Sequence, residues 1–145
     1  MSTLDDTAPV AAETTVCKVL VVDDTFASRQ LLTRMLHQFA RVDVREARDG
    51  LTAFDQFCAI QPDITFLDID MPHKSGIDVL KEIRAAAPQS YVVMVSAAAS
   101  LETVQSTLEL NVGGFVVKPY SARRILDVLT KYARETGASD LLRED

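Results

Sequence analysis

The sequence predicts an α/β protein, a three-layer sandwich in which an open, parallel, five-stranded sheet carries helices on both faces. Apolar runs typical of buried strands begin near Val19, Val42, Ile64, Tyr91 and Phe115. The 22 to 27 residues between successive starts leave room for one helix and two loops. Strands that alternate with helices form parallel sheets with right-handed crossovers. Five such units are too few to close an eight-stranded barrel, so we expect an open sheet.

The composition indicates one domain with two short extensions. The chain has 145 residues, 48% hydrophobic and 25% charged, as is ordinary for a single domain. We expect a flexible extension over residues 1–16, a domain over 17–135 and a C-terminal tail over 136–145, with no second domain. Residues 1–15 contain no basic side chain, unlike a signal peptide. No apolar run approaches the roughly 18 residues of a membrane span, and a net charge of −6 argues against direct nucleic-acid binding.

The first unit begins with a β-branched strand at residues 18–22, which ends abruptly at Asp23 and Asp24. Thr25 or Asp24 can cap the helix that follows. The apolar stripe expected on this helix consists of Phe26, Leu32, Met35, Leu36 and Phe39.

The second strand, at residues 42–45, alternates apolar and polar residues, as an edge strand with one solvent-exposed face does. Asp49 and Gly50 then turn the chain into a helix. The apolar stripe of this helix is expected to consist of Ala53, Phe54, Phe57 and Cys58.

The three remaining units follow the same pattern. Their strands are expected at residues 64–67, 91–95 and 115–117. Pro88 stops the third helix, and Ser121 can cap the last. Apolar stripes are formed by Ile77, Leu80 and Ile83, by Leu101, Val104 and Leu108, and by Ile125, Leu126, Leu129 and Tyr132.

The two cysteines indicate a reducing compartment. Cys17 and Cys58 form neither a C-x-x-C motif nor a metal-ligand spacing, and both lie among apolar residues. We therefore expect buried, reduced thiols and a cytoplasmic location.

Polar side chains stand at the carboxyl ends of four predicted strands. Asp23 and Asp24 follow the first strand, Asp68 ends the third, Ser96 the fourth, and Lys118 follows the fifth. All strands of a parallel sheet end at one edge, where open α/β sheets bind ligands, so these groups should lie together. Separately, Asp24 could be a helix cap, Ser96 a turn residue and Lys118 a solvated charge. Together they favour a functional site, with Asp68 as the reactive group.

Three carboxylates at one point require a cation. Two carboxylates about 4 Å apart repel by roughly 4 kcal/mol at an effective dielectric constant near 20, so three need protons or a metal ion. Oxygen ligands without His or Cys suit Mg²⁺, which commonly also accepts a phosphate oxygen. A carboxylate beside a Mg²⁺-bound phosphoryl group can attack it and form an aspartyl phosphate. Lys118 and Ser96 would then bind the added oxygens.

Two short pairs and two longer blocks occur along the chain in a recognisable order and spacing. They are Asp23-Asp24, Leu67-Asp68-Ile69-Asp70-Met71-Pro72, Ser96-Ala97 and Gly114-Phe115-Val116-Val117-Lys118-Pro119. With these motifs the sequence resembles a response-regulator receiver domain, the CheY-like family of two-component signalling. The resemblance covers about residues 17–135.

The resemblance implies a flavodoxin-like fold with strand order 2-1-3-4-5. It also implies that Asp68 is the phosphoacceptor. Mg²⁺ would be held by Asp23, Asp24, Asp68 and the main-chain carbonyl of Asp70. In such a domain the chain catalyses only its own phosphorylation and dephosphorylation.

The resemblance further implies that Lys118 contacts the phosphoryl group, that Ser96 is the switch hydroxyl and that Phe115 is the switch aromatic. Phosphorylation would draw Ser96 toward the phosphate and turn Phe115 inward. The face built by the fourth helix, fifth strand and fifth helix would then change its affinity for partners. A histidine kinase or histidine phosphotransferase would supply the phosphoryl group. A separate target protein or a phosphorelay would receive the signal.

The resemblance determines two positions near the site less well, and the first of them, occupied here by Asp70, varies within the family. The side chain of Asp70, two residues past the phosphoacceptor, could be a solvated loop acid, or it could repel hydroxide or position a water. We therefore predict that Asp70→Asn changes the lifetime of the phosphorylated form. Ala98, two residues past Ser96, offers no amide or acid to assist hydrolysis.

Two other functions fit part of the pattern. A Mg²⁺-dependent phosphohydrolase of the haloacid dehalogenase type would use the first acid of Asp68-Ile69-Asp70. That family, however, has Thr or Val where Pro72 stands here, and its motif usually follows the first strand. Multiple turnover on small phosphate esters would support it. A receiver-like binding module that is not phosphorylated would show no response to beryllofluoride and Mg²⁺.

Overall fold

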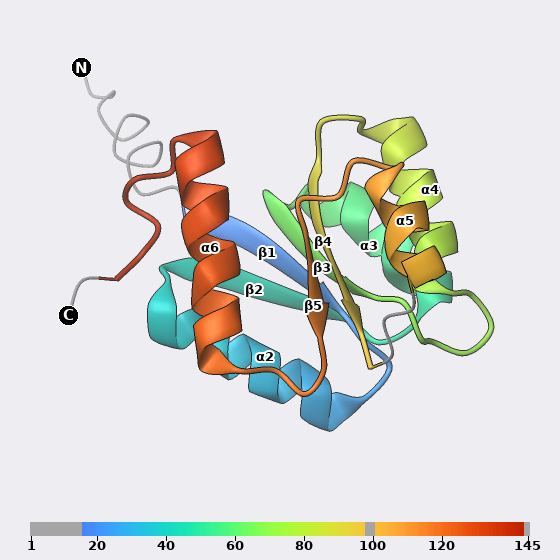
Figure 1. Ribbon diagram of the computed structural model, residues 1–145, viewed down its shortest axis with the longest axis horizontal. Helices are drawn as coiled ribbons and strands as arrows, with labels where there is room; N and C mark the ends of the chain where they lie inside the picture. The colour runs from blue at the N-terminus through green and yellow to red at the C-terminus, as the bar shows by residue number, and fades with distance from the viewer. Residues whose placement is uncertain (1–15, 98–100, 144–145) are drawn as a thin grey trace, which may run out of the picture.

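The sheet is parallel, and within the described residues its five strands lie in the order β2-β1-β3-β4-β5 (Figure 1). The computed structural model describes residues 16–97 and 101–143. The strands are β1 (Cys17–Val22), β2 (Val42–Ala47), β3 (Ile64–Asp68), β4 (Tyr91–Ser96) and β5 (Gly114–Val117). The helices are α2 (Phe26–Phe39), α3 (Gly50–Ile60), α4 (Gly76–Ala86), α5 (Leu101–Leu108) and α6 (Ala122–Thr136). The predicted fold class and strand order are confirmed.

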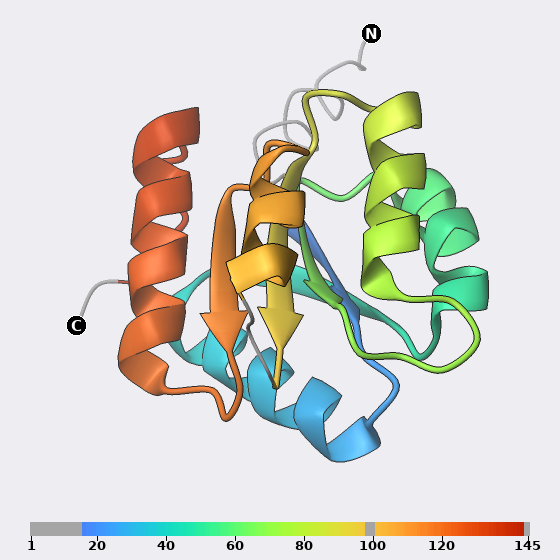
Figure 2. The ribbon, with the colours of Figure 1, turned by 45° about the vertical axis from the view of Figure 1, so that its right-hand side comes forward.

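Helices cover both faces of the sheet. α2 and α6 lie on one face, and α3, α4 and α5 lie on the other (Figures 1 and 2). The alternating side chains of β1 enter both cores: Val19 and Val21 pack toward α2 and α6, whereas Leu20 and Val22 pack toward α3 and α4. Burial of each such side chain stabilises the fold by about 1.5–3 kcal/mol.

The central strand β3 and the edge strand β2 differ in burial, as their sequences predict. Every residue of β3 is buried, because neighbouring strands flank it and helices cover both its faces. β2 lies at the edge of the sheet and exposes Arg45 and Glu46. The central position of β3 brings the Asp68 that ends it into the middle of the carboxyl edge.

Short side chains cap three helices. Asp49, Ser75 and Ser121 each accept a hydrogen bond from a main-chain N–H in the first turn of α3, α4 and α6, respectively. The cap predicted at Ser121 is confirmed. Thr25 occupies the cap position of α2 but makes no side-chain cap bond. The Asp23 carboxylate accepts the hydrogen bond from Thr25 N instead, at 2.8 Å.

Three residues of the predicted apolar stripes lie at the surface: Phe26, Cys58 and Leu108, the last of which is 59% exposed near the end of α5. Phe26 is 66% exposed, because it begins α2 at the carboxyl edge of the sheet. The guanidinium of Arg29 lies 5.6 Å from the centre of its ring. Cys58 is exposed because it lies one helical step past the buried Phe57, and Cys17 is only partly buried. Both thiols are free.

The chain remains packed beyond the end of α6. Gly137 ends the helix with a φ of 76°, a conformation that favours glycine. The chain then returns to α2, where Leu141 is 5% exposed in the core and Arg143 N donates to the Phe39 carbonyl. Much of the segment predicted to be a tail is therefore part of the packed structure. The predicted N-terminal extension, except residue 16, and Ala98 lie outside the described residues.

Among the described residues, no helix combines the length and apolar character needed to cross a membrane.

Candidate functional site

The predicted polar residues meet at the carboxyl edge of the sheet. β4 and β5 point in one direction and end at the same edge (Figure 2). Ser96, the last residue of β4, pairs with Val117 at the end of β5, and Lys118 N donates to the Ser96 carbonyl at 2.8 Å. Asp68, the last residue of β3, pairs with Val95. Parallel register thus sets Asp68, Ser96 and Lys118 side by side.

Asp23, Asp24 and Asp68 form an acidic cluster. Each offers one carboxylate oxygen, and these atoms lie within 4.8 Å of one another. Asp23 and Asp68 are only 1% and 2% exposed, whereas Asp24 is exposed. A set of hard oxygen donors without nitrogen or sulfur fits Mg²⁺, and its partly open side leaves room for water and a phosphate oxygen. The donor set therefore fits the predicted ion.

Lys118 joins the two buried carboxylates. Its ammonium lies 2.9 Å from Oδ2 of Asp23 and 3.2 Å from Oδ2 of Asp68, and its side chain is 18% exposed. Burial lowers the pKa of Lys118, but the hydrogen bond to Asp23 and the charge of Asp68 outweigh this and raise it above its ordinary value. Lys118 therefore stays charged at neutral pH and is placed to receive anionic oxygens.

The carboxyl group of Asp68 has an unusually high pKa for an aspartate. Burial, followed by the negative charge of Asp23, raises its pKa to about 6, against the lowering effect of Lys118. Both oxygens have donors: Oδ1 accepts from Asp70 N at 3.1 Å, and Oδ2 accepts from Lys118. The carboxyl group is thus held in one orientation.

The side chain of Asp70 contacts the end of β4. Its Oδ2 accepts a hydrogen bond from the Ser96 hydroxyl at 2.7 Å and from Ala97 N at 3.3 Å. Although Asp70 is exposed, it is not the purely solvated acid that one alternative described. No pattern in the sequence indicated this contact, because it depends on the course of the loop after β3 and not on the order of the strands.

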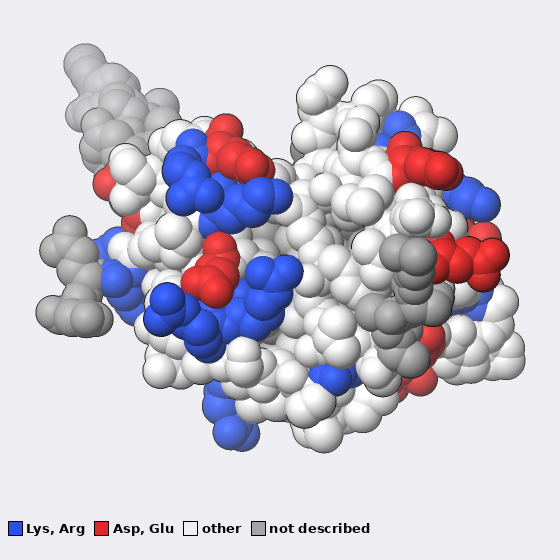
Figure 3. All heavy atoms as spheres, viewed as in Figure 1, with Lys and Arg blue, Asp and Glu red and all other residues white. Residues whose placement is uncertain are grey.

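Phe115 lies partly buried on β5, packed beside the core under α3 and α4. Arg124 donates to the Phe115 carbonyl at 2.7 Å and so ties α6 to β5. Basic and acidic side chains gather together over α6 (Figure 3). Arg123 forms an ion pair with Asp127. The basic residues at the start of α6 are therefore partly neutralised or used within the fold.

Two further side chains support Asp23. The Tyr120 hydroxyl lies 3.4 Å from its Oδ2 and donates to it. Burial, followed by the charges of Asp23 and Asp68, raises the pKa of Tyr120, so the hydroxyl remains protonated. Arg29 donates to the Asp23 carbonyl at 2.9 Å and also pairs with Glu46. The position of Tyr120 directly after Lys118-Pro119 could have drawn attention to it, whereas nothing in the sequence pattern indicated Arg29.

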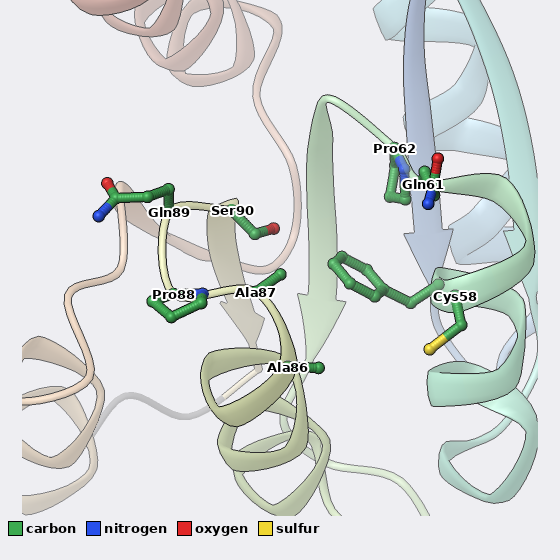
Figure 4. Close-up of a pocket in the computed structure, with 9 residues that line it drawn as sticks. Cys58, Gln61, Pro62, Ala86, Ala87, Pro88, Gln89 and Ser90 are labelled. Atoms are coloured by element: carbon green, nitrogen blue, oxygen red, sulfur yellow. The ribbon is translucent and has the colours of Figure 1, made fainter.

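A separate cavity of about 480 Å³ lies between the end of α3 and the α4–β4 connection (Figure 4). Phe57, Cys58, Pro62 and Pro88 are among its lining residues, none of which is charged. The strands begin at this edge, opposite the acidic cluster. The cavity therefore takes no part in the chemistry of the site.

Taken together, the 2-1-3-4-5 sheet, the acidic cluster and the adjoining lysine define a class of α/β domain with an acidic pocket at its carboxyl edge. Residues 19–130 match the family model of the response regulator receiver domain. The chain therefore belongs to the CheY-like receiver family of two-component signalling.

Curated relatives include chemotaxis proteins. CheY of Listeria monocytogenes is 34% identical over 117 residues, which are 81% of this chain and 98% of that protein. CheY of Thermotoga maritima is 30% identical over 117 residues, with the same two coverages.

Solved receiver structures are similar as well. CheY4 of Vibrio cholerae matches with a TM-score of 0.75 and 27% identity, over 81% of this chain and 99% of that chain. A CheY-like receiver domain from Methanospirillum hungatei matches with a TM-score of 0.78 over 86% of this chain and 99% of its own. At 21% identity the latter supports the fold alone.

Proposed function

We propose that this chain is a response-regulator receiver domain that accepts a phosphoryl group on Asp68 in a Mg²⁺-dependent reaction. The observation that carries the proposal is the position of Asp68. Its buried carboxyl lies within the acidic cluster and 3.2 Å from the Lys118 ammonium. An anion-binding cation beside a metal-binding carboxylate is what an aspartyl phosphate requires.

The donor is a phosphohistidine on a histidine kinase or a histidine phosphotransferase. An oxygen of Asp68 attacks phosphorus, and the new O–P bond replaces the N–P bond of the donor. The electron pair of the broken bond stays on the imidazole nitrogen, and the product is an acyl phosphate. Asp68 must be ionised to attack, and its pKa of about 6 leaves it so at neutral pH.

The other site residues act around this step. Asp23, Asp24, Asp68 and the main-chain carbonyl of Asp70 would hold Mg²⁺, and its positive charge would neutralise phosphoryl oxygens. Lys118 pairs with one of these oxygens. Its distance to Asp68 supports this role without movement of either strand.

Phosphorylation then acts as the switch. Ser96 donates its hydroxyl to the phosphoryl group, and Phe115 turns inward. The face formed by α5, β5 and α6 changes its affinity for a target protein or a phosphorelay partner, by non-covalent binding. The partly buried position of Phe115 on this face supports its role. A cytoplasmic location follows from a kinase or phosphotransferase as donor.

Intact-mass measurement tests the assignment. Wild type, Asp68→Asn and the control Asp43→Asn, which changes a half-exposed acid of β2, are incubated with acetyl phosphate and Mg²⁺. Wild type and Asp43→Asn should gain one phosphoryl group, and Asp68→Asn should gain none. An adduct on all three proteins would contradict the proposal, as would the absence of any adduct together with no beryllofluoride binding by wild type. If wild type binds beryllofluoride but gains no adduct, the site can hold a phosphoryl analogue, and only acetyl phosphate is unsuitable as the donor.

A further inference from the structure

The carboxylate of Asp70 bridges the loop after β3 to the end of β4. Its Oδ2 lies 2.7 Å from Ser96 Oγ and 3.3 Å from Ala97 N, both of which donate to it. Ser96 is only 1% exposed, so its hydroxyl is shielded from water. The main-chain N of Asp70 also donates to Asp68 Oδ1 at 3.1 Å. Residue 70 thus contacts both the phosphoacceptor and the switch hydroxyl.

A serine hydroxyl carries one proton and donates it to one strong acceptor at a time. A bond to a carboxylate is charge-assisted, and 2.7 Å is a typical length for an O–H···O⁻ bond. While Ser96 donates to Asp70, its proton is not available to an oxygen bound to Asp68. The two acceptors therefore compete for the same donor.

We propose that the Asp70 carboxylate is a latch that holds the Ser96 hydroxyl in the unphosphorylated arrangement and opposes its capture by the phosphoryl group. The proposal rests on the proposed function and adds a regulatory role for one side chain of the same site. Asp70 is a positioning residue: it acts through Ser96. The Ala97 N–H, which contacts the same oxygen, holds the carboxylate in place.

If Asp70 acts as a latch, the effect of removing its carboxylate depends on the Ser96 hydroxyl, whereas simple charge repulsion by Asp70 does not. The negative charge of Asp70 also disfavours a phosphoryl group nearby, but this effect does not require Ser96. Because Asp70 is exposed, solvent and salt weaken the repulsion. A double-mutant cycle with Ser96 separates the two, because only the latch disappears when the hydroxyl is removed.

The cycle uses wild type, Asp70→Ala, Ser96→Ala and the double variant. The probe is beryllofluoride with saturating Mg²⁺, followed through amide NMR signals at the ends of β3 and β4. Asp70→Ala keeps the main-chain carbonyl assigned to Mg²⁺. With Ser96 present, the substitution should tighten beryllofluoride binding about threefold to tenfold. In the Ser96→Ala background the same substitution should change binding by less than about twofold.

Two further variants test whether the effect on beryllofluoride binding is specific to the Asp70 carboxylate. Asp70→Asn keeps a weaker, neutral acceptor and should tighten binding by less than Asp70→Ala does. Asp55→Ala removes an exposed acid of α3 and serves as a charge control, with no expected change. Urea unfolding checks that all variants are folded, so altered binding cannot come from loss of structure.

The possible outcomes decide between the explanations. Tightening that depends on Ser96 supports the latch. Equal tightening by Asp70→Ala with and without Ser96 overturns the latch in favour of charge repulsion. If Asp70→Ala leaves binding unchanged or weaker in the protein that retains Ser96, the latch is overturned outright. If wild type binds no beryllofluoride and gains no phosphoryl mass, the proposed function itself fails, and the latch fails with it.

Discussion

The Lys118 ammonium lies 2.9 Å from Oδ2 of Asp23, nearer than to the phosphoacceptor candidate Asp68 at 3.2 Å. One side chain from the end of β5 therefore neutralises the ends of β1 and β3 at once. Because Asp23 and Asp68 are almost fully buried, water screens their mutual repulsion poorly. Lys118 thus has a structural role at the centre of the sheet edge in addition to its proposed role toward a phosphoryl group.

We predict that Lys118→Ala lowers the free energy of unfolding by about 2–3 kcal/mol in EDTA, because it leaves buried carboxylates without their cation. Saturating Mg²⁺ should restore part of this loss. Urea unfolding followed by far-UV circular dichroism measures both. Arg123→Ala is the control: this side chain is 84% exposed in its ion pair, and its loss should cost less than about 0.5 kcal/mol. Equal losses for the two variants would contradict the prediction.

Asp68 should make stability fall as pH rises. Its folded-state pKa of about 6 lies above the value of 3.8 for an unperturbed carboxyl, mainly because of burial. Between these values the folded state binds more protons than the unfolded state, so the free energy of unfolding decreases from about pH 4 to pH 6 and stays low above that.

We therefore predict that Asp68→Asn, which cannot ionise, is more stable than wild type by about 1–3 kcal/mol at pH 7.5 in EDTA. The difference should vanish near pH 4. Thermal unfolding of both proteins across this range provides the measurement. Asp43→Asn should instead be less stable than wild type at pH 7.5, because the hydrogen bond from Arg45 lowers the pKa of the half-exposed Asp43. A gain for Asp68→Asn that does not vary with pH would count against the assigned cause.

Much of the site follows from the order of strands alone. Asp68, Ser96 and Lys118 are separated by 22 to 50 residues, yet each stands at a strand end. Parallel pairing places strand ends at one edge, so alternation of strand and helix was enough to predict that they meet. Receiver membership and the sheet order are confirmed by the family match and the topology.

Contacts that depend on loop paths could not be predicted in this way. The bond between Asp70 and Ser96 requires a particular course of the chain after β3. Phe26 had helical spacing, but periodicity describes the face of a helix and not how far its first turn projects beyond the sheet. Its 66% exposure reflects that projection. The packing of Leu141 arises from the return of the chain after Gly137, where no strand or helix pattern remains.

Gly76 is required by the close approach of α4 to the end of β3. A Cβ at this position would lie 2.1 Å from the Asp68 carbonyl oxygen and 2.9 Å from Ile69 Cα. Both are backbone atoms that cannot rotate away. We predict that Gly76→Ala destabilises the fold by about 1–3 kcal/mol and shifts Asp68 enough to slow its phosphorylation by acetyl phosphate.

Gly114→Ala provides the matched comparison for Gly76. A Cβ at residue 114 would meet only side-chain atoms of Val93, at 3.8 and 4.0 Å, which is ordinary contact. Its unfolding free energy should stay within about 0.5 kcal/mol of wild type. If Gly76→Ala matched it in both stability and phosphorylation rate, the close approach would not constrain the site.

The segment after α6 should contribute to stability although it lies near the chain end. Leu141 is 5% exposed and belongs to the core beneath α2 and α6. Leu142 forms an antiparallel bridge with Ala40, which fixes the returning chain against the end of α2. We predict that Leu141→Ala lowers the free energy of unfolding by about 2–3 kcal/mol, because the anchored backbone cannot collapse fully into the cavity. Leu108→Ala, at a leucine that is 59% exposed, should cost less than about 0.5 kcal/mol. Similar urea midpoints for the two variants would show that the segment is not anchored in solution, since only a packed Leu141 can distinguish them.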